Sequence, residues 1–225
     1  MLNYFGGNKM KRNILFILIF FAFSLQVHAQ TNICGSTNSA NPTMSNPSYS
    51  LTSNISIPVF FHVIISNDNS GDVLDSQLNS QIYMLNLGYS NTSFSFFLAG
   101  INRIKNNNWR NLYQDSQQEI SMKNSLVIDP EHALNIYITS TMEYYGWSSY
   151  PWEKQIYPLR QGVVIRTGCL PGGDILDNNL GKVVVHEVGH FLGLFHTFDE
   201  FLKCQDADQV NDTPIHLENT GCPPD

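Results

Sequence analysis

Residues 186–196 read His-Glu-Val-Gly-His-Phe-Leu-Gly-Leu-Phe-His. His186 and His190 are four residues apart, so on a helix both imidazoles lie on one face and can reach the same ion. Glu187 lies one step round the helix, too far aside to be a ligand but placed to reach a water on that ion. Gly193 can adopt a positive φ, which would end the helix and let His196 return as a third ligand. Three neutral nitrogens leave the fourth zinc position open, as is typical of a catalytic zinc site.

Chance and a purely structural helix are the alternatives to a zinc site. A chance His-Glu-x-x-His is expected in about one percent of chains of this composition, and the Gly-x-x-His that follows makes a coincidence much rarer. A core helix with incidental histidines would leave two imidazoles buried and unpaired among valines, which is costly. The sequence therefore predicts one zinc ion held by His186, His190 and His196.

Upstream of this helix, the hydrophobic pattern predicts one α/β domain with a mixed sheet. Strands are expected at 57–65, 94–104, 134–139, 146–152 and 162–166, and helices at 75–88, 118–127 and 181–192. Pro151 favours an edge position for the strand at 146–152, because proline cannot donate to a central ladder.

The first 54 residues contain two segments that are not expected in the folded domain. Residues 1–29 are predicted to be a signal peptide, because Lys9, Lys11 and Arg12 precede twelve apolar residues and Val27-His28-Ala29 offers small residues at a cleavage site. About 20 apolar residues would be needed to span a bilayer. Residues 30–54, rich in Asn, Ser, Thr and Pro, are predicted to be extended and poorly ordered. The catalytic domain would then occupy residues 55–225.

Charge and cysteine content limit the partners and the compartment. The chain has a net charge of −7, and because three of its 12 basic residues and none of its 19 acidic ones lie in the leader, the remainder would carry −10. Such an acidic surface excludes nucleic acid and anionic membranes as expected partners. Export would permit disulfides among Cys34, Cys169, Cys204 and Cys222, and all three pairings remain open.

At this point the sequence resembles a known family. The pattern His186-Glu187-x-x-His190-x-x-Gly193-x-x-His196 is similar to the zinc-binding consensus of the metzincin metalloproteases. Its continuation through Phe198, with Asn-Asp-Thr-Pro at 211–214 and Gly-Cys-Pro at 221–223, resembles the pappalysin branch, peptidase family M43. Segments at 57–64, 94–100, 134–137, 146–152 and 170–173 look like those of secreted, fungal-type extracellular metalloproteases of that branch. The resemblance covers residues 55–225.

The resemblance implies a secreted, extracellular zinc endopeptidase that acts on protein or peptide substrates. It implies a five-stranded twisted sheet whose antiparallel edge strand binds the substrate, beside an active-site helix in which Glu187 is the general base. By position, the edge strand would comprise Gly146, Trp147, Ser148, Ser149 and Tyr150. A monomer is expected.

The sequence also departs from the family. Metzincins carry a methionine in a tight turn beneath the zinc, downstream of the third histidine, whereas every methionine of this chain precedes the motif. The lower subdomain is therefore predicted to be truncated, and the alternative function is a catalytically silent zinc-binding fragment of such a protease. A zinc enzyme with Glu218 as third ligand is a further alternative, which the positions of Gly193 and His196 disfavour.

Two smaller expectations concern the remaining polar residues. The loop at 204–214 is similar to the pappalysin loop that holds calcium, which would place Ca²⁺ at Asp208 and Thr213; a solvated acidic loop is the alternative. His62, His132 and His216 are expected to be structural residues without a functional role.

Overall fold

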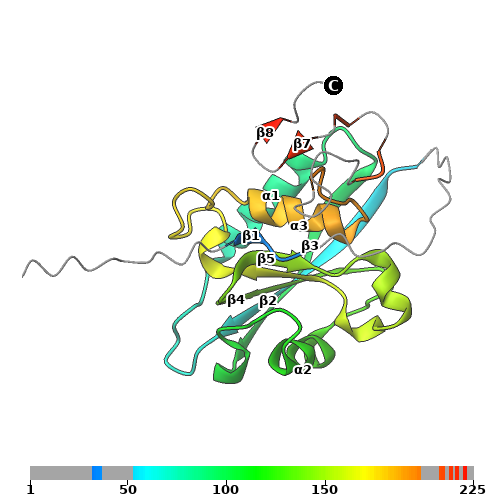
Figure 1. Ribbon diagram of the computed structural model, residues 1–225. Helices are drawn as coiled ribbons and strands as arrows, with labels where there is room; N and C mark the ends of the chain where they lie inside the picture. Colours follow the sequence, from blue (N-terminus) through cyan, green and yellow to red (C-terminus); the bar gives the residue numbers. More distant parts are fainter. Residues whose placement is uncertain are drawn as a thin grey trace, which may run out of the picture. The chain divides into compact units, whose positions relative to one another are not determined.

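A mixed β-sheet lies at the centre of the structure, a computed structural model that describes residues 32–36, 53–198, 208–210, 213–214, 216–217 and 220–221 (Figure 1). All of these belong to one unit, Thr31–Asp225. The strands are β1 (Asn32–Cys34), β2 (Ile55–Ile65), β3 (Phe94–Lys105), β4 (Leu134–Thr139), β5 (Tyr144–Ser148) and β6 (Val163–Arg166). Their order is β1-β5-β6-β4-β2-β3. β2, β3, β4 and β6 are parallel, β5 is antiparallel to β6, and β1 is parallel to β5.

Helices cover both faces of this sheet. α1 (Asp75–Gly88) and α3 (Lys182–Phe191) contact each other on one face, and α2 (Gln117–Leu126) lies on the other (Figure 1). Short 3₁₀ helices form the connections: η1 (Asn107–Trp109), η2 (Pro151–Gln155), η3 (Pro158–Arg160) and η4 (Thr167–Cys169). β7 (His216–Leu217) and β8 (Thr220–Gly221) form a separate antiparallel pair. The architecture is the α/β mixed sheet that the sequence predicts.

Two hydrophobic clusters, one on each face, hold the helices to the sheet. The larger joins α1 and α3 to the sheet through residues such as Leu78, Leu85, Val184 and Val188. The smaller lies on the α2 side and consists of Ile64, Leu112, Met122, Tyr137, Trp147 and Val164. All six residues of β4 are buried, as expected of a parallel strand covered on both faces.

Most predicted elements are confirmed. The helix at 75–88 and the strand at 134–139 have the predicted bounds, and β2, β3, β6, α2 and α3 differ from prediction by at most two residues at either end. The strand predicted at 146–152 is wrong at both ends, because β5 spans Tyr144–Ser148 and Pro151 begins η2. A proline with its fixed φ and missing N–H suits the first position of a helix.

The prediction of a poorly ordered segment at 30–54 is also wrong in part. Asn32–Cys34 forms β1 on the outer side of β5, so β5 is not at the edge of the described sheet. Backbone hydrogen bonds to an open strand edge explain why a short polar segment becomes ordered there. Residues 1–29, the predicted signal peptide, lie outside the described residues.

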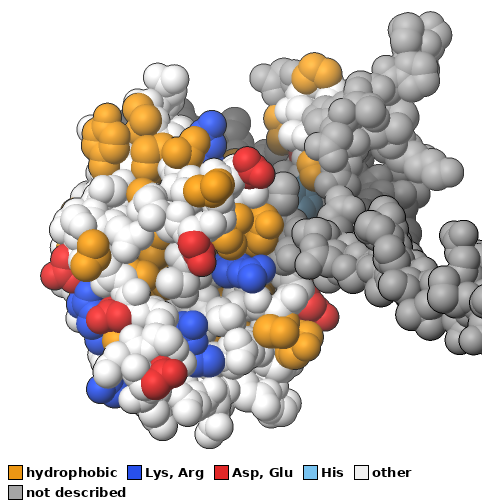
Figure 2. All heavy atoms as spheres, turned by 90° about the vertical axis from the view of Figure 1, so that its left-hand side faces the viewer, with side chains coloured by type: hydrophobic (Ala, Val, Ile, Leu, Met, Phe, Trp, Pro, Cys, Tyr) orange, Lys and Arg blue, Asp and Glu red, His pale blue; other side chains and the backbone are white. Residues whose placement is uncertain are grey.

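Exposed apolar side chains are distributed over several places on the surface. On the face shown in Figure 2, apolar side chains form several distinct groups among charged and uncharged polar ones. None of the helices in the described residues is long and apolar enough to cross a membrane.

Candidate active site

Helix α3 carries the histidine motif and is anchored by its apolar face. Val183, Val184 and Val188 are buried against the sheet. The helix ends at Phe191, and Gly193 has a φ of 100°, a conformation that favours glycine. The Leu194 N–H donates to the Gly189 carbonyl at 2.9 Å and closes this turn. As predicted, the turn brings the chain back towards the helix, with His196 beside it.

The structure brings the three predicted histidines together. The Nε2 atoms of His186, His190 and His196 form a triangle in which each pair is 3.1 Å apart. The Nδ1–H of His190 donates to the Leu194 carbonyl at 2.7 Å, so the Nε2 lone pair of this ring points into the triangle. Burial lowers the pKa of His186, and it lowers that of His190 to about 3, which keeps both rings neutral.

This donor set fits a zinc ion. Neutral imidazole nitrogens are common zinc ligands, and tetrahedral bonds of about 2.0–2.1 Å would place two such nitrogens about 3.3 Å apart. The observed spacing of 3.1 Å is close to that value. Lone pairs facing one another at this distance repel unless a cation lies between them.

A cysteine from the far end of the chain completes the cluster. The ligand atoms of Cys34, His186, His190 and His196 all lie within 4.8 Å of one another. Cys34 Sγ is 3.5 Å from His190 Nε2. Burial, and next the nearby charge of Glu187, raise the pKa of the Cys34 thiol. Sequence reasoning missed this residue, because a single cysteine in a polar stretch carries no local signal.

Glu187 lies beside the cluster in a fully enclosed position. Its side chain is 0% exposed, and burial raises its pKa to about 8. Oε2 accepts a hydrogen bond from the Ser36 hydroxyl at 3.1 Å, whereas Oε1 has no partner. The absence of a side chain at Gly146 makes room for it: a Cβ there would lie 3.0 Å from Glu187 Cγ and 2.9 Å from Ile165 Cδ1.

The predicted substrate strand lies against this site. β5 contains Gly146, Trp147 and Ser148, and Ser149 and Tyr150 follow it. The outer side of β5 is occupied by segment 32–36, with Cys34 opposite Gly146 and the Gly35 N–H donating to the Gly146 carbonyl at 2.9 Å. The Ser148 N–H donates to the Ser36 hydroxyl at 2.9 Å. The strand therefore has the predicted neighbours, and another part of the chain covers it.

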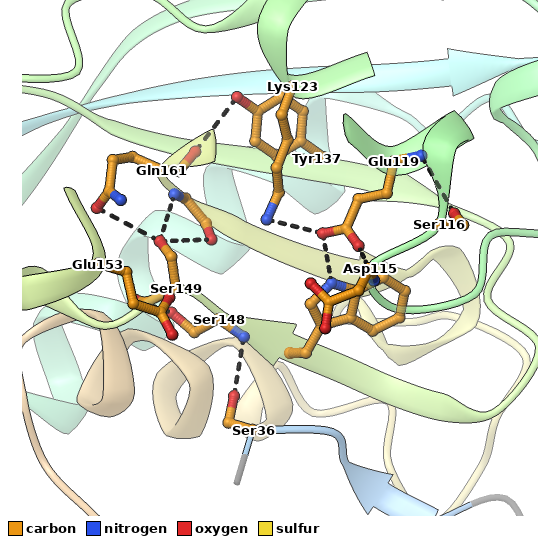
Figure 3. A network of polar contacts seen from close by, with 12 residues as sticks. Ser36, Asp115, Ser116, Glu119, Lys123, Tyr137, Ser148, Ser149, Glu153 and Gln161 are labelled. Carbon is orange, nitrogen blue, oxygen red and sulfur yellow. Dashed lines mark hydrogen bonds and ion pairs between the residues drawn. The ribbon is translucent and has the colours of Figure 1, made fainter. Parts of the chain in front are cut away.

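The other face of β5 holds a second buried carboxylate, Glu119 (Figure 3). Glu119 pairs with Lys123 at 2.8 Å and accepts hydrogen bonds from Trp147 Nε1 at 2.6 Å and from the Asp115 N–H at 2.7 Å. A cavity of about 160 Å³ adjoins this network and reaches Ser148 in β5 and Ser36, which follows β1. Sequence reasoning missed this polar network, although Glu119 and Lys123 are four residues apart, the spacing of an ion pair on a helix.

Tyr150 contacts the Nδ1 side of the His190 ring. Its hydroxyl is 3.3 Å from His190 Nδ1, and its ring stacks on Trp152 at 4.5 Å. The Nδ1–H of His190 is thus shared between the Leu194 carbonyl and the Tyr150 hydroxyl. Such partners fix the orientation of a metal-binding imidazole.

The other predicted residues are not drawn into the site. The Asp208 carboxylate accepts from the Val210 N–H at 3.0 Å and the Thr213 N–H donates to the Val210 carbonyl at 3.1 Å, so the described part of this loop forms local turns and gives no support to calcium. His62 is buried and bonded to Asn135, and His132 pairs with Asp129 on the surface, which confirms a structural position for both.

The structure describes two of the four cysteines that could form disulfides. Cys34 and Cys169 are free thiols, so neither takes part in a disulfide. Cys204, Cys222, the side chain of His216 and Glu218 lie outside the described residues.

Comparisons with known proteins agree with this geometry. A family model of peptidase M43, described as pregnancy-associated plasma protein-A, matches residues 118–222. An extracellular metalloprotease of Arthroderma benhamiae is 37% identical over 191 residues, covering 83% of this chain and 68% of that protein. One of Colletotrichum graminicola is 34% identical over 174 residues, covering 75% and 61%. Mature mirolysin of Tannerella forsythia, solved with a cleaved peptide, has a TM-score of 0.63 at 26% identity over 73% of each chain.

Proposed function

The chain belongs to the M43 family of metallopeptidases, and we propose that it is a secreted zinc endopeptidase that hydrolyses peptide bonds of protein substrates. The observation that carries this proposal is the triangle of Nε2 atoms from His186, His190 and His196 beside the buried carboxylate of Glu187. Secretion is supported by relatives that are named extracellular metalloproteases.

The three histidines would hold the zinc through Nε2. They are neutral, their nitrogens converge, and His190 is oriented by hydrogen bonds at Nδ1. Zinc, when bound, supplies Lewis acidity that activates water and polarises a carbonyl.

Glu187 is the general base of this proposal. Its Oε2 accepts the proton of the attacking water and then delivers it to the amine nitrogen that leaves. The carboxylate is buried beside β5, and the histidine rings one position before and three positions after it contribute to the cluster. Its position next to Gly146 keeps it close to the strand that would carry the substrate.

The outer edge of β5 would bind the substrate backbone. An extended peptide can add to such an edge through main-chain hydrogen bonds. The N–H of Ser148 is one donor that faces outward there, since its present acceptor is the Ser36 hydroxyl. The structure of mirolysin with a cleaved peptide supports a peptide as the class of substrate.

Metal content and hydrolysis together test the proposal. We expect one zinc per chain by elemental analysis, lost in His190→Ala and retained in His132→Ala, whose side chain is exposed and paired with Asp129. Hydrolysis of a peptide library is measured for the unaltered chain and for Cys34→Ala/Ser36→Ala, in which neither the thiol meets the histidines nor the hydroxyl meets Glu187. Full zinc content in His190→Ala would refute the ligand assignment. A zinc-loaded Cys34→Ala/Ser36→Ala variant that cleaves no peptide would refute the endopeptidase.

A further inference from the structure

A cavity of about 350 Å³ lies at the carboxyl ends of the parallel strands. Its lining includes polar or charged residues from the connections after four strands: Arg110, Ser140, Arg166, Thr167 and Asp174, with Gly71. We propose that this cavity binds an oxyanion, a carboxylate or a phosphate or sulfate group, through the guanidinium groups of Arg110 and Arg166. None of the residues that the proposed function assigns to zinc binding or catalysis lines it, so the site would be an addition to that function.

The cavity lies where two neighbouring connections leave the sheet on opposite faces. β2 and β3 are adjacent parallel strands. The chain passes from β2 through Gly71 into α1, and from β3 through Arg110 into α2, and these two helices cover opposite faces (Figure 1). In open α/β sheets, ligands bind in the crevice outside the carboxyl ends of the strands at such a point. Ser140 after β4 and Thr167 after β6 extend the same crevice across the sheet.

The two arginines that line this cavity lack a carboxylate partner. Among the described residues, no carboxylate oxygen lies within 4.0 Å of either guanidinium group. Arg110 Nη1 donates to the Ile64 carbonyl at 2.8 Å, and Arg166 Cζ lies 5.7 Å from the ring centroid of Tyr145. A guanidinium group has five N–H donors, so each can still donate to a ligand. Burial lowers the pKa of Arg110 more than the charge of Asp68 raises it, and a bound anion would compensate this half-buried cation.

Charge and space at the cavity both favour a small anion. Two arginines and the single carboxylate of Asp174 give the lining a net charge of +1, whereas the whole chain carries −7. Gly71 has a φ of 87°, and a Cβ there would lie 2.3 Å from Arg110 Nη1, so the missing side chain lets this loop lie against the guanidinium group. Guanidinium groups bind carboxylate and phosphate oxygens through paired N–H donors. Small-molecule pockets typically measure about 300–1,000 Å³, so there is also room for a group attached to the anion.

Chemical modification of individual arginines tests which side chains meet the anion. The zinc-loaded full chain is treated with phenylglyoxal at constant ionic strength, with sodium sulfate, sodium acetate or sodium chloride, and each arginine is followed by mass spectrometry. Saturating sulfate or acetate should slow modification of Arg110 and Arg166 by about tenfold, the usual effect of a hydrogen bond to a charged group. Arg160, which is also half-buried and stacks on Tyr157, is the matched control and should react at one rate throughout. The more protective anion identifies the tetrahedral or the planar group as the preferred ligand. Unchanged rates at Arg110 and Arg166, or equal slowing of Arg160, would overturn the inference.

Calorimetric titration of zinc-loaded variants with the more protective anion gives a second test. Arg166→Gln should weaken binding about tenfold or more, and Arg160→Gln should leave it unchanged. Asp174→Asn removes the one carboxylate of the lining and should tighten binding about threefold, a gain that a damaged fold could not produce.

Zinc is present in every variant, so any anion bound at the metal contributes equally to all of them. Unaltered affinity in Arg166→Gln, or weaker binding in Asp174→Asn, would overturn the inference. Neither test measures hydrolysis, so failure of the anion site and failure of the proposed peptidase are separate results.

Discussion

A buried glutamate lies against each face of β5, and the two differ in how fully their carboxylate oxygens are hydrogen-bonded. Glu119, on the α2 side, is 4% exposed and has a partner for each oxygen: Lys123 and Trp147 on Oε1, and the Asp115 N–H on Oε2. Glu187, on the α3 side, is 0% exposed and has an unpartnered Oε1. A buried charge that is fully paired holds a structure together, whereas one left incompletely paired retains a capacity to react. The difference distinguishes a structural carboxylate from the proposed catalytic one on the two sides of β5.

Substitution of Glu187 should reduce activity more than any other change considered below. Glu187→Gln should lower peptide hydrolysis by about 10²–10⁴-fold, the usual loss of a general base, with zinc content unchanged. The free energy of unfolding should change little, because burial raises the pKa of Glu187 to about 8 and a neutral amide of the same size replaces a largely neutral carboxyl. Hydrolysis, elemental analysis and urea unfolding are the three measurements. Glu143→Gln, at an exposed position, is the control, and near-normal turnover in Glu187→Gln would remove Glu187 from the mechanism.

The second prediction concerns the structural side. Glu119→Gln leaves Lys123, which is only 5% exposed, without its carboxylate, and should lower the free energy of unfolding by about 3–5 kcal/mol. Glu131→Gln, which breaks the more exposed pair with Lys154, should cost less than about 1 kcal/mol. Urea unfolding of both variants gives the comparison. Equal losses would mean that burial does not distinguish the two ion pairs.

A smaller effect is expected at Tyr150, which lines the cavity on the α2 side and also reaches His190 on the α3 side. Tyr150→Phe should weaken zinc binding by about tenfold, at the lower end for a residue that orients a metal-binding imidazole, because the Leu194 carbonyl still accepts from Nδ1. Competition with a chelator measures the affinity, and Tyr157→Phe, on a half-exposed ring, should leave it unchanged. An unaltered affinity in Tyr150→Phe would show that the Leu194 carbonyl alone fixes His190.

The smallest effect concerns pH and a third buried titratable group. His62 is buried, stacks on Tyr137 and bonds to Asn135, and burial lowers its pKa from 6.5 despite that hydrogen bond. Below about pH 6.5 the unfolded chain therefore binds a proton that the folded chain does not, so stability is present above that pH and declines as the pH falls. His62→Gln should show a flatter decline between pH 7 and 5 in urea unfolding. Parallel curves for the two proteins would mean that His62 does not contribute.

Local patterns were sufficient for most of the fold and for half of the site. The helix at 75–88 follows from its apolar spacing and Gly88, and β2 from a nearly continuous apolar run at 57–65. The three histidines and Glu187 follow from one helical spacing and one glycine. Each of these signals lies within a few residues of the feature that it predicts.

The remainder depends on contacts between distant residues. Cys34 lies 156 residues from His190, and Ser36 lies 151 from Glu187, so no periodicity connects them. β1 has three residues, too few for a pattern. The end of β5 was misjudged because Pro151 is compatible with an edge strand and with the first position of a 3₁₀ helix, and only the packing of Tyr150 and Trp152 selects the second.

The parallel pairing of β1 with β5 also has a consequence for the order of events during synthesis. Asn32 pairs with Tyr144, and Ser36 bonds to the amide of Ser148, 112 residues later. At translation rates of about 5–20 residues per second, β5 is synthesised on the order of ten seconds after β1, and α3 is synthesised later still. Contacts of such high sequence separation close late, after local helices and neighbouring parallel strands have formed. Because β5 ends at Ser148 and α3 begins only at Lys182, the partner strand of β1 is made before the histidine cluster, so β1 can pair with β5 before α3 packs beside it.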